Sequence, residues 1–295
     1  MTPSPSDPTR LDARPRRRRR VASVLPTLMT LGNVICGFAA IHYAAKPISE
    51  SAFGFSTLSF AGGLVFLGMF FDAIDGTVAR LTRSTSAIGA QLDSLADVIT
   101  FGVAPAFMTL RLVSHYYGPA EDHTILGPAD DEWGKVLWAI AAFYVCCTAL
   151  RLARFNAEVR SDKAEDHLYF KGLPSPGAGG TVASLIVLHQ YLLHRHAGIE
   201  EGLAFARAAA LGIPIVTAIV AFAMVSNIRY SHFVNKILRS RRTFPGLIRV
   251  VLPVLIAIWW PREMLAAGFV LYALSGPVMS LVRPARPIIA GGTPA

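Results

Sequence analysis

The chain has 295 residues, of which 53% are hydrophobic and only 16% are charged. Soluble globular domains are less apolar and about 25% charged, so this composition argues against a soluble domain and excludes disorder of the whole chain. The net charge of +9 fits binding to nucleic acid or to a membrane surface, and the positions of the basic residues decide between the two. The three cysteines lie in apolar segments without zinc-ligand spacing, so neither a disulfide framework nor a zinc site is expected.

The first 23 residues are polar, contain four prolines and include five consecutive arginines at 16–20. They predict a disordered basic cytoplasmic tail over 1–23 that contacts lipid headgroups rather than nucleic acid. The apolar segment that follows is too long for a secretory signal and lacks a clear cleavage site. We therefore expect this segment to be the first membrane helix.

Further apolar segments recur along the rest of the chain, and about 20 apolar residues suffice to cross a bilayer. By this measure the sequence predicts eight spans, at 24–44, 58–80, 93–114, 134–154, 175–194, 204–225, 246–261 and 264–282. The seventh is short and contains Pro253, and the last two are expected to form a hairpin around residues 261–263. The predicted fold class is an all-α polytopic membrane helix bundle.

The loops between these spans differ in charge, and Lys and Arg collect on the cytoplasmic side of membrane proteins. Here they collect in the N-terminal tail and in the alternate loops 82–92, 155–173 and 227–243, whereas 116–133 contains five acids and no Lys or Arg. We therefore expect both termini on the cytoplasmic side of the inner membrane. The expected domains are the tail at 1–23, a membrane domain at 24–230, a basic cytoplasmic loop at 231–245, a C-terminal membrane hairpin at 246–282 and a cytoplasmic tail at 283–295.

Four carboxylates lie near the cytoplasmic ends of the second and third spans. The first set repeats with the spacing of one helix face: Asp72, Asp75, Gly76, Ala79 and Arg80. The second set also lies on one face: Gly89, Asp93 and Asp97. Because the loop between the two helices is short, the helices are antiparallel neighbours and the two acidic faces can converge.

Carboxylates placed together require a counter-charge, and an all-oxygen ligand set suits Mg²⁺, Mn²⁺ or Ca²⁺ better than zinc. Two bridged divalent ions form a common clamp for displacement at phosphorus. Gly76 and Gly89 allow a bulky ligand to approach the backbone, and Arg80 offers a fork for phosphate. The pattern thus indicates a pyrophosphate-bearing substrate at the membrane surface. A buried polar network and cation transport through intramembrane carboxylates are the alternatives.

The whole pattern DxxDGxxAR, eight residues, then GxxxDxxxD resembles the signature of the CDP-alcohol phosphatidyltransferases, and every signature position is present. The flanking segments 31–37, 94–106, 151–156 and 169–176 are similar to those of the integral-membrane phosphatidylserine synthases within that family. The resemblance runs from about residue 24 to 230. It implies a six-helix membrane core, to which this chain adds two C-terminal helices.

The resemblance also implies roles for individual residues. Asp72, Asp75 and Asp93 would bind metal, as two Mg²⁺ or Mn²⁺ ions, and Asp97 would lie at the metal site and act as general base. The residues expected to contact CDP-diacylglycerol are Gly76, Arg80 and Ser86, with Asn33 and Thr30 either reaching the nucleotide or only packing between helices.

The acceptor site is expected near the cytoplasmic end of the fourth span. Arg151 and Arg154, three residues apart, would bind the serine carboxylate or a substrate phosphate, or else would only extend to lipid headgroups. Lys171 is a third cationic candidate on the same side. The segment Gly172–Pro176 would either line the amino-acid pocket or simply begin the fifth span.

The activity that the resemblance implies belongs to phospholipid biosynthesis. Such an enzyme makes phosphatidylserine and CMP from CDP-diacylglycerol and L-serine by a single displacement, as a homodimer among membrane lipids and without a nucleic-acid partner. The nearest alternative is another acceptor, such as glycerol 3-phosphate or inositol phosphate. More distant alternatives are an intramembrane prenyltransferase and a cation transporter. The absence of an internal repeat argues against the transporter.

Overall fold

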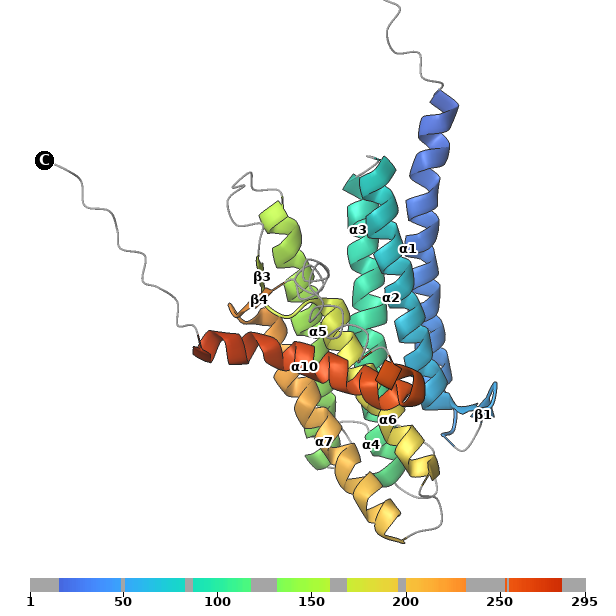
Figure 1. Cartoon of the computed structure of the whole chain (residues 1–295), viewed down its shortest axis with the longest axis vertical. Coiled ribbons are helices and arrows are strands. Elements are labelled where there is room, and N and C mark those ends of the chain that lie inside the picture. Colours follow the sequence, from blue (N-terminus) through green and yellow to red (C-terminus); the bar gives the residue numbers. More distant parts are fainter. Residues whose placement is uncertain are drawn as a thin grey trace, which may run out of the picture.

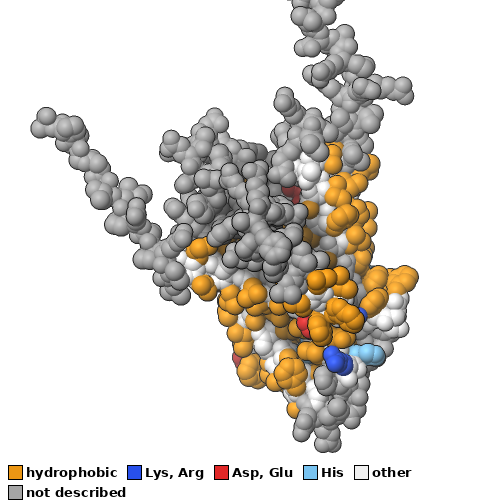
Figure 2. Space-filling model, in the orientation of Figure 1, with side chains coloured by type: hydrophobic (Ala, Val, Ile, Leu, Met, Phe, Trp, Pro, Cys, Tyr) orange, Lys and Arg blue, Asp and Glu red, His pale blue; other side chains and the backbone are white. Residues whose placement is uncertain are grey.

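The computed structural model describes residues 16–48, 51–82, 87–117, 132–159, 169–195, 200–231, 253 and 255–282. These residues are almost entirely helical (Figure 1), and six of their helices are long and apolar enough to cross a membrane. Figure 2 shows an outer face on which hydrophobic side chains predominate over charged ones. The predicted all-α polytopic membrane bundle is therefore confirmed.

The described helices account for most of the described residues. In chain order they are α1 (Arg16–Ala45), α2 (Thr57–Thr82), α3 (Ala87–Asp97), the π-helical segment η2 (Val98–Val103), α4 (Ala104–Tyr117), α5 (Glu132–Val159), α6 (Ser175–Arg195), α7 (Glu200–Val225) and α10 (Pro261–Val282). Two antiparallel ribbons complete the fold: β1 (Ser51–Ala52) with β2 (Phe55–Ser56), and β3 (Tyr169–Lys171) with β4 (Arg229–Ser231). Helix α3, η2 and α4 together form the third membrane span, from Ile88 to Tyr117.

Six of the eight predicted spans coincide with these apolar helices. The predicted span at 175–194 is a helix, α6, although it is not among the six that are apolar enough to cross a membrane by length and composition. Helix α6 begins with small residues and is largely buried, and helices inside a membrane bundle pack closely through small residues rather than through apolar bulk. Half of the span predicted at 246–261 lies outside the described residues, and its part at 255–259 is helical.

The start of α1 differs from the sequence-based boundary. Residues 16–23, assigned to a disordered tail, are helical and begin α1 directly after Pro15. Arginine is a good helix former, and proline is common beside a helix start, so the arginine run extends the membrane helix rather than ending it. The apolar part of α1 begins at Pro26.

The bundle is arranged around α6. Helices α1 and α2 run side by side along their length, and α10 crosses over α6 (Figure 1). Helix α6 contacts α2, α4, α7 and α10. The buried core joins side chains of η2, α4, α5, α6 and α7, among them Phe101, Leu112, Tyr144, Ile186 and Met224.

The third span widens into a π-helix immediately after Asp97, and Pro105 explains why. Proline has no N–H to donate to the carbonyl four residues earlier, which here is Phe101 O, and its ring crowds that carbonyl. The Tyr144 hydroxyl of α5 donates to Phe101 O at 2.9 Å and so satisfies it. The Ala104 N–H bonds to Ile99 O, five residues back. Such π-segments are frequent at functional sites.

Arg111 is a buried charge that the sequence-based search for intramembrane charges overlooked. It lies in α4 with 5% exposure, and its guanidinium donates to Ala44 O at 3.0 Å and to Lys46 O at 3.2 Å. The last carbonyls of a helix lack intrahelical partners. Arg111 therefore caps the end of α1, at the end of the bundle away from the signature carboxylates.

The segment leading into α6 is fixed by backbone geometry. Gly172 has φ +84°, a left-handed conformation that favours glycine, and its N–H donates to Ile228 O at 2.8 Å. The Leu173 N–H donates to Ala223 O at 3.0 Å. The β3–β4 ribbon continues this pairing, with Phe170 opposite Tyr230. The segment that leads into α6 is thereby held against the end of α7 and the β4 strand that follows it.

Candidate active site

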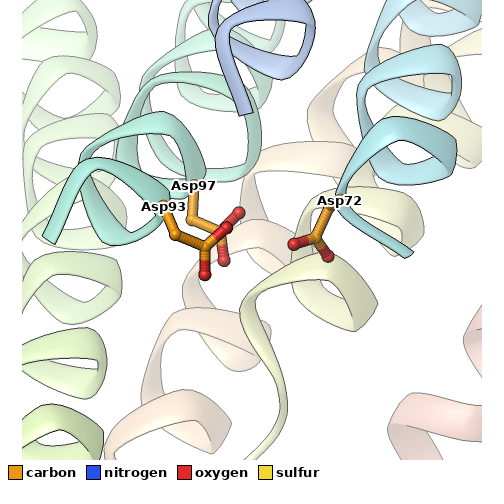
Figure 3. Close-up of side chains that lie close together, drawn as sticks. All are labelled: Asp72, Asp93 and Asp97. Carbon is orange, nitrogen blue, oxygen red and sulfur yellow. The ribbon is translucent and has the colours of Figure 1, made fainter. Parts of the chain in front are cut away.

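Three aspartates converge where α2 and α3 face each other (Figure 3). One carboxylate oxygen each from Asp72 of α2 and from Asp93 and Asp97 of α3 lies within 4.8 Å of the others. Asp97 is buried, while Asp72 and Asp93 are half-buried. The two acidic helix faces therefore meet as their spacing predicted.

Asp75 lies on the same helix, one turn beyond Asp72, but outside this group of three. Its buried carboxylate accepts a hydrogen bond from the Thr30 hydroxyl of α1. It still interacts electrostatically with Asp72 and Asp93. The fourth predicted ligand thus lies beside the cluster and is oriented by α1, and its ligation of metal stays a prediction.

Asn33 of α1 orients Asp97. Its side-chain amide donates to Asp97 Oδ1 at 3.3 Å, and its backbone carbonyl accepts from Thr100 Oγ1 at 2.9 Å. A Cβ added at Gly68 of α2 would lie 2.8 Å from Asn33 Oδ1, so only glycine allows this close approach. Thr30 and Asn33 were predicted to reach the nucleotide or to pack between helices. In the structure each hydrogen-bonds to a signature aspartate.

The other predicted contacts with CDP-diacylglycerol lie along α2 and after it. Gly76 is exposed, and a Cβ placed there would meet nothing within 4 Å, which leaves open space beside the carboxylates. Arg80 lies near the end of α2, but its side chain is outside the described part of the structure, as is that of Lys171 in β3. Ser86 lies outside the described residues. Their predicted roles therefore rest on the sequence.

The two arginines of α5 contact different residues in the structure. The Arg151 guanidinium donates to the Ser175 hydroxyl at the start of α6 and interacts electrostatically with Asp72 and Asp97. Among the described residues, no ion pair within 4.0 Å joins it to an acid. Arg154 donates instead to Asn227 Oδ1 at 3.0 Å, beyond the end of α7. Of the two, Arg151 therefore faces the carboxylates.

Ser175 is the first residue of α6, buried, and it accepts the hydrogen bond from Arg151. The segment Gly172–Pro176 therefore begins a helix and places Ser175 against Arg151, and its contribution to an amino-acid pocket stays a prediction.

Sequence reasoning missed three side chains near the site. Asn156 of α5 donates to Ser94 Oγ of α3 at 2.8 Å, next to Asp93, and both residues belong to the flanking segments that carried the resemblance. Tyr272 of α10 interacts electrostatically with Arg151, and Asn227 binds Arg154. No local pattern marks Tyr272 or Asn227, because tertiary packing alone brings them to α5.

The chemistry of this cluster fits a divalent cation. Asp72, Asp93 and Asp97 offer only oxygen atoms, as Mg²⁺ and Mn²⁺ prefer. Carboxylates this close together repel one another, and a cation between them removes that cost. Arg151 lies near the cluster without an ion pair to any of the three carboxylates, so a cationic group stands beside the acidic one.

Comparisons with known proteins agree with this site. The family model for CDP-alcohol phosphatidyltransferase matches residues 23–228. A relative from Helicobacter pylori (strain J99) named CDP-diacylglycerol–serine O-phosphatidyltransferase is 32% identical over 253 residues, 86% of this chain and 89% of the relative. Proteins of the same name from Bacillus subtilis and Saccharomyces cerevisiae are 31% and 37% identical over 209 and 116 residues. These matches cover 71% and 38% of this chain, and 90% and 36% of the relatives.

The family match covers the region that carries the complete aspartate signature, and the structure brings three of its aspartates together. The chain belongs to the CDP-alcohol phosphatidyltransferase family.

Proposed function

We propose that this membrane enzyme transfers the phosphatidyl group of CDP-diacylglycerol to the hydroxyl of L-serine and releases CMP. The observation that carries the proposal is the convergence of Asp72, Asp93 and Asp97 with Arg151 nearby. The choice of serine is supported by the names of the relatives from three organisms. Glycerol 3-phosphate or inositol phosphate would use the same chemistry and is the alternative acceptor.

The aspartates would hold one or two divalent cations, Mg²⁺ or Mn²⁺. Asp72, Asp93 and Asp97 would be ligands, with Asp75 beside them. When bound, such ions neutralise charge on the pyrophosphate and on the departing phosphate. The protein contributes the fixed positions of its carboxylates, which α1 supports through Thr30 and Asn33.

Asp97 is the proposed general base. It is the most buried of the three converging carboxylates, and Asn33 fixes its orientation. It would accept the proton of the serine hydroxyl while that oxygen forms a bond to the phosphorus carrying diacylglycerol. The bond from this phosphorus to the oxygen of CMP breaks, and CMP leaves with the electron pair. Positioning and electrostatics supply most of the acceleration in such a site.

The serine carboxylate requires a cationic partner, and Arg151 is the proposed one. We expect Arg151→Lys to raise the KM for serine about tenfold or more, because an ammonium cannot reproduce the fork of a guanidinium. The KM for CDP-diacylglycerol should change much less. The measurement is CMP release by the purified full chain as a function of serine concentration, which for the wild type should saturate.

Arg154→Lys is the matched control, since Arg154 lies one turn away and contacts Asn227. We expect its serine KM to stay within about twofold of the wild type, as for a surface contact of small net energy. An unchanged serine KM for Arg151→Lys would remove Arg151 from the acceptor site. CMP release that does not depend on serine would contradict the proposed reaction itself.

The active site is proposed to face the cytoplasm, where both termini are also proposed to lie. The support is the charge of the loops, with basic residues after residue 231 and acids at 116–133. A topology reporter fused after residue 240 should score as cytoplasmic, and one inserted near Asp122 should score as external. The reverse result would contradict the charge argument. The homodimer implied by the resemblance stays a prediction.

A further inference from the structure

A second polar site lies at the opposite end of the bundle from the aspartates. It is a cavity of about 300 Å³ bordered by the β1–β2 ribbon and the start of α2, the last turns of α6 and the start of α10. Ser59 of α2 lines it, and Asp72 follows 13 residues later, about 20 Å along the helix. The cavity is therefore separate from the active site.

The cavity lies at the boundary between the membrane and water. The apolar part of α1 ends at Ala45, that of α2 begins at Thr57, and that of α10 begins at Pro261. Trp259 and Trp260 precede α10 and are exposed, as is usual for tryptophan at the level of lipid headgroups. A ligand in this cavity would lie at headgroup depth.

The polar side chains of the cavity are suited to an anion. Arg262 and His194 line it together with three hydroxyls, those of Ser51, Ser56 and Ser59. Among the described residues that line it there is no Asp or Glu. Arginine with several hydroxyl donors is the set of groups that binds phosphate oxygens.

Two contacts orient the Arg262 guanidinium and the serine hydroxyls of the cavity. The Arg262 guanidinium lies over the Tyr191 ring, 4.3 Å from its centroid, so its face is stacked while its N–H edge stays available. Within the described residues, no carboxylate lies within 4.0 Å of it. The Ser56 hydroxyl donates to Ser59 Oγ at 2.9 Å, which leaves the Ser59 proton to be donated to a ligand.

We infer that this cavity binds the phosphate of an anionic phospholipid headgroup in the leaflet opposite the active site. The depth of the cavity favours a lipid over a soluble ion, and the Arg262 guanidinium together with the three hydroxyls favours a headgroup with net negative charge. The acyl chains of such a lipid would extend along the exposed apolar surface of α10. This inference depends neither on the proposed phosphatidyl transfer nor on which alcohol is its acceptor.

The test is native mass spectrometry of the purified full chain, incubated with equal amounts of phosphatidylglycerol and phosphatidylcholine. The wild type should retain phosphatidylglycerol in preference. Arg262→Gln should lower that retention about tenfold, the effect of losing a charge-assisted hydrogen bond. Ser59→Ala should lower it less. Arg207→Gln is the matched control, because Arg207 is an exposed arginine of α7 outside the cavity.

The possible outcomes of this experiment distinguish a lipid site from its alternatives. Equal retention by the wild type and Arg262→Gln would overturn the site, and an equal loss in Arg207→Gln would show only general attraction to a charged surface. Displacement of phosphatidylglycerol by millimolar inorganic phosphate would assign the cavity to a soluble phosphate and overturn the lipid. CMP release should be normal in all three variants, which verifies their folding without bearing on the inference.

Discussion

Asp72→Asn and Asp93→Asn are each expected to lower the rate of CMP release by about 10³-fold or more. Each substitution removes one charge from the group of carboxylates that lie within 4.8 Å, while it preserves the shape of the side chain. Loss of one element of an electrostatic clamp typically costs 10²–10³ in rate, and a lost metal ligand costs further occupancy. The measurement is CMP release with saturating Mg²⁺ or Mn²⁺, together with Mn²⁺ binding followed by electron paramagnetic resonance.

Glu132→Gln provides the matched control for charge. Glu132 is exposed at the start of α5 and pairs with Lys135 at 2.6 Å. Its substitution should leave both activity and Mn²⁺ binding unchanged, since exposed ion pairs contribute little. Wild-type activity in either aspartate variant, at equal protein level in the membrane, would contradict the role of that carboxylate as a ligand.

Asp97→Asn is expected to lower turnover by about 10²–10⁴-fold, the usual contribution of a general base. Binding of CDP-diacylglycerol should be less affected than in Asp72→Asn, because Asp97 is proposed to act on the acceptor proton. The side chain should stay in place, since Asn33 can still hydrogen-bond to the new amide oxygen. The measurements are single-turnover CMP release and equilibrium binding of the lipid nucleotide.

The two readouts separate the possible roles of Asp97. Normal turnover in Asp97→Asn would refute the base assignment. Complete loss of CDP-diacylglycerol binding would make Asp97 chiefly a metal ligand. Asn33→Ala tests the supporting contact, and it should lower turnover while leaving metal binding in place.

The convergence of the aspartates could be predicted from the sequence because it depends on local rules. The i, i+3 and i, i+4 spacings place each acidic set on one helix face, and a short connection makes the helices antiparallel. The pattern therefore located Asp72, Asp93 and Asp97 before any tertiary contact was known. It did not show that Asp75 turns toward Thr30, because that contact depends on the packing of α1 against α2.

The two arginines of α5 show that local spacing does not predict which residues a long side chain contacts. Three residues apart, Arg151 and Arg154 share a helix face, and the sequence could not tell whether one or both would bind the acceptor. In the structure their long side chains contact different neighbours. Arg151 contacts Ser175, and Arg154 contacts Asn227. Those neighbours are brought to α5 by the glycine turn at 172 and by the end of α7, which no pattern within α5 encodes.

Hydropathy located the apolar helices but carries no information on how they pack. It predicted a helix at 175–194, but not that this helix, α6, is largely buried and packs through small residues. It also passed over Arg111, because one charge in a long apolar segment scarcely changes the average. The partners of that charge, Ala44 O and Lys46 O, become visible only in three dimensions.

The most direct test of the account is the identity of the lipid product in a competition between acceptors. The purified full chain would be given CDP-diacylglycerol, Mn²⁺ or Mg²⁺, and an equal mixture of L-serine, glycerol 3-phosphate, inositol phosphate and glycerol, and its lipids analysed by mass spectrometry. Phosphatidylserine as the dominant product, formed in step with CMP and lost in Asp72→Asn, is the predicted result. A product carrying another alcohol, with no phosphatidylserine, would contradict the assignment of serine as the acceptor.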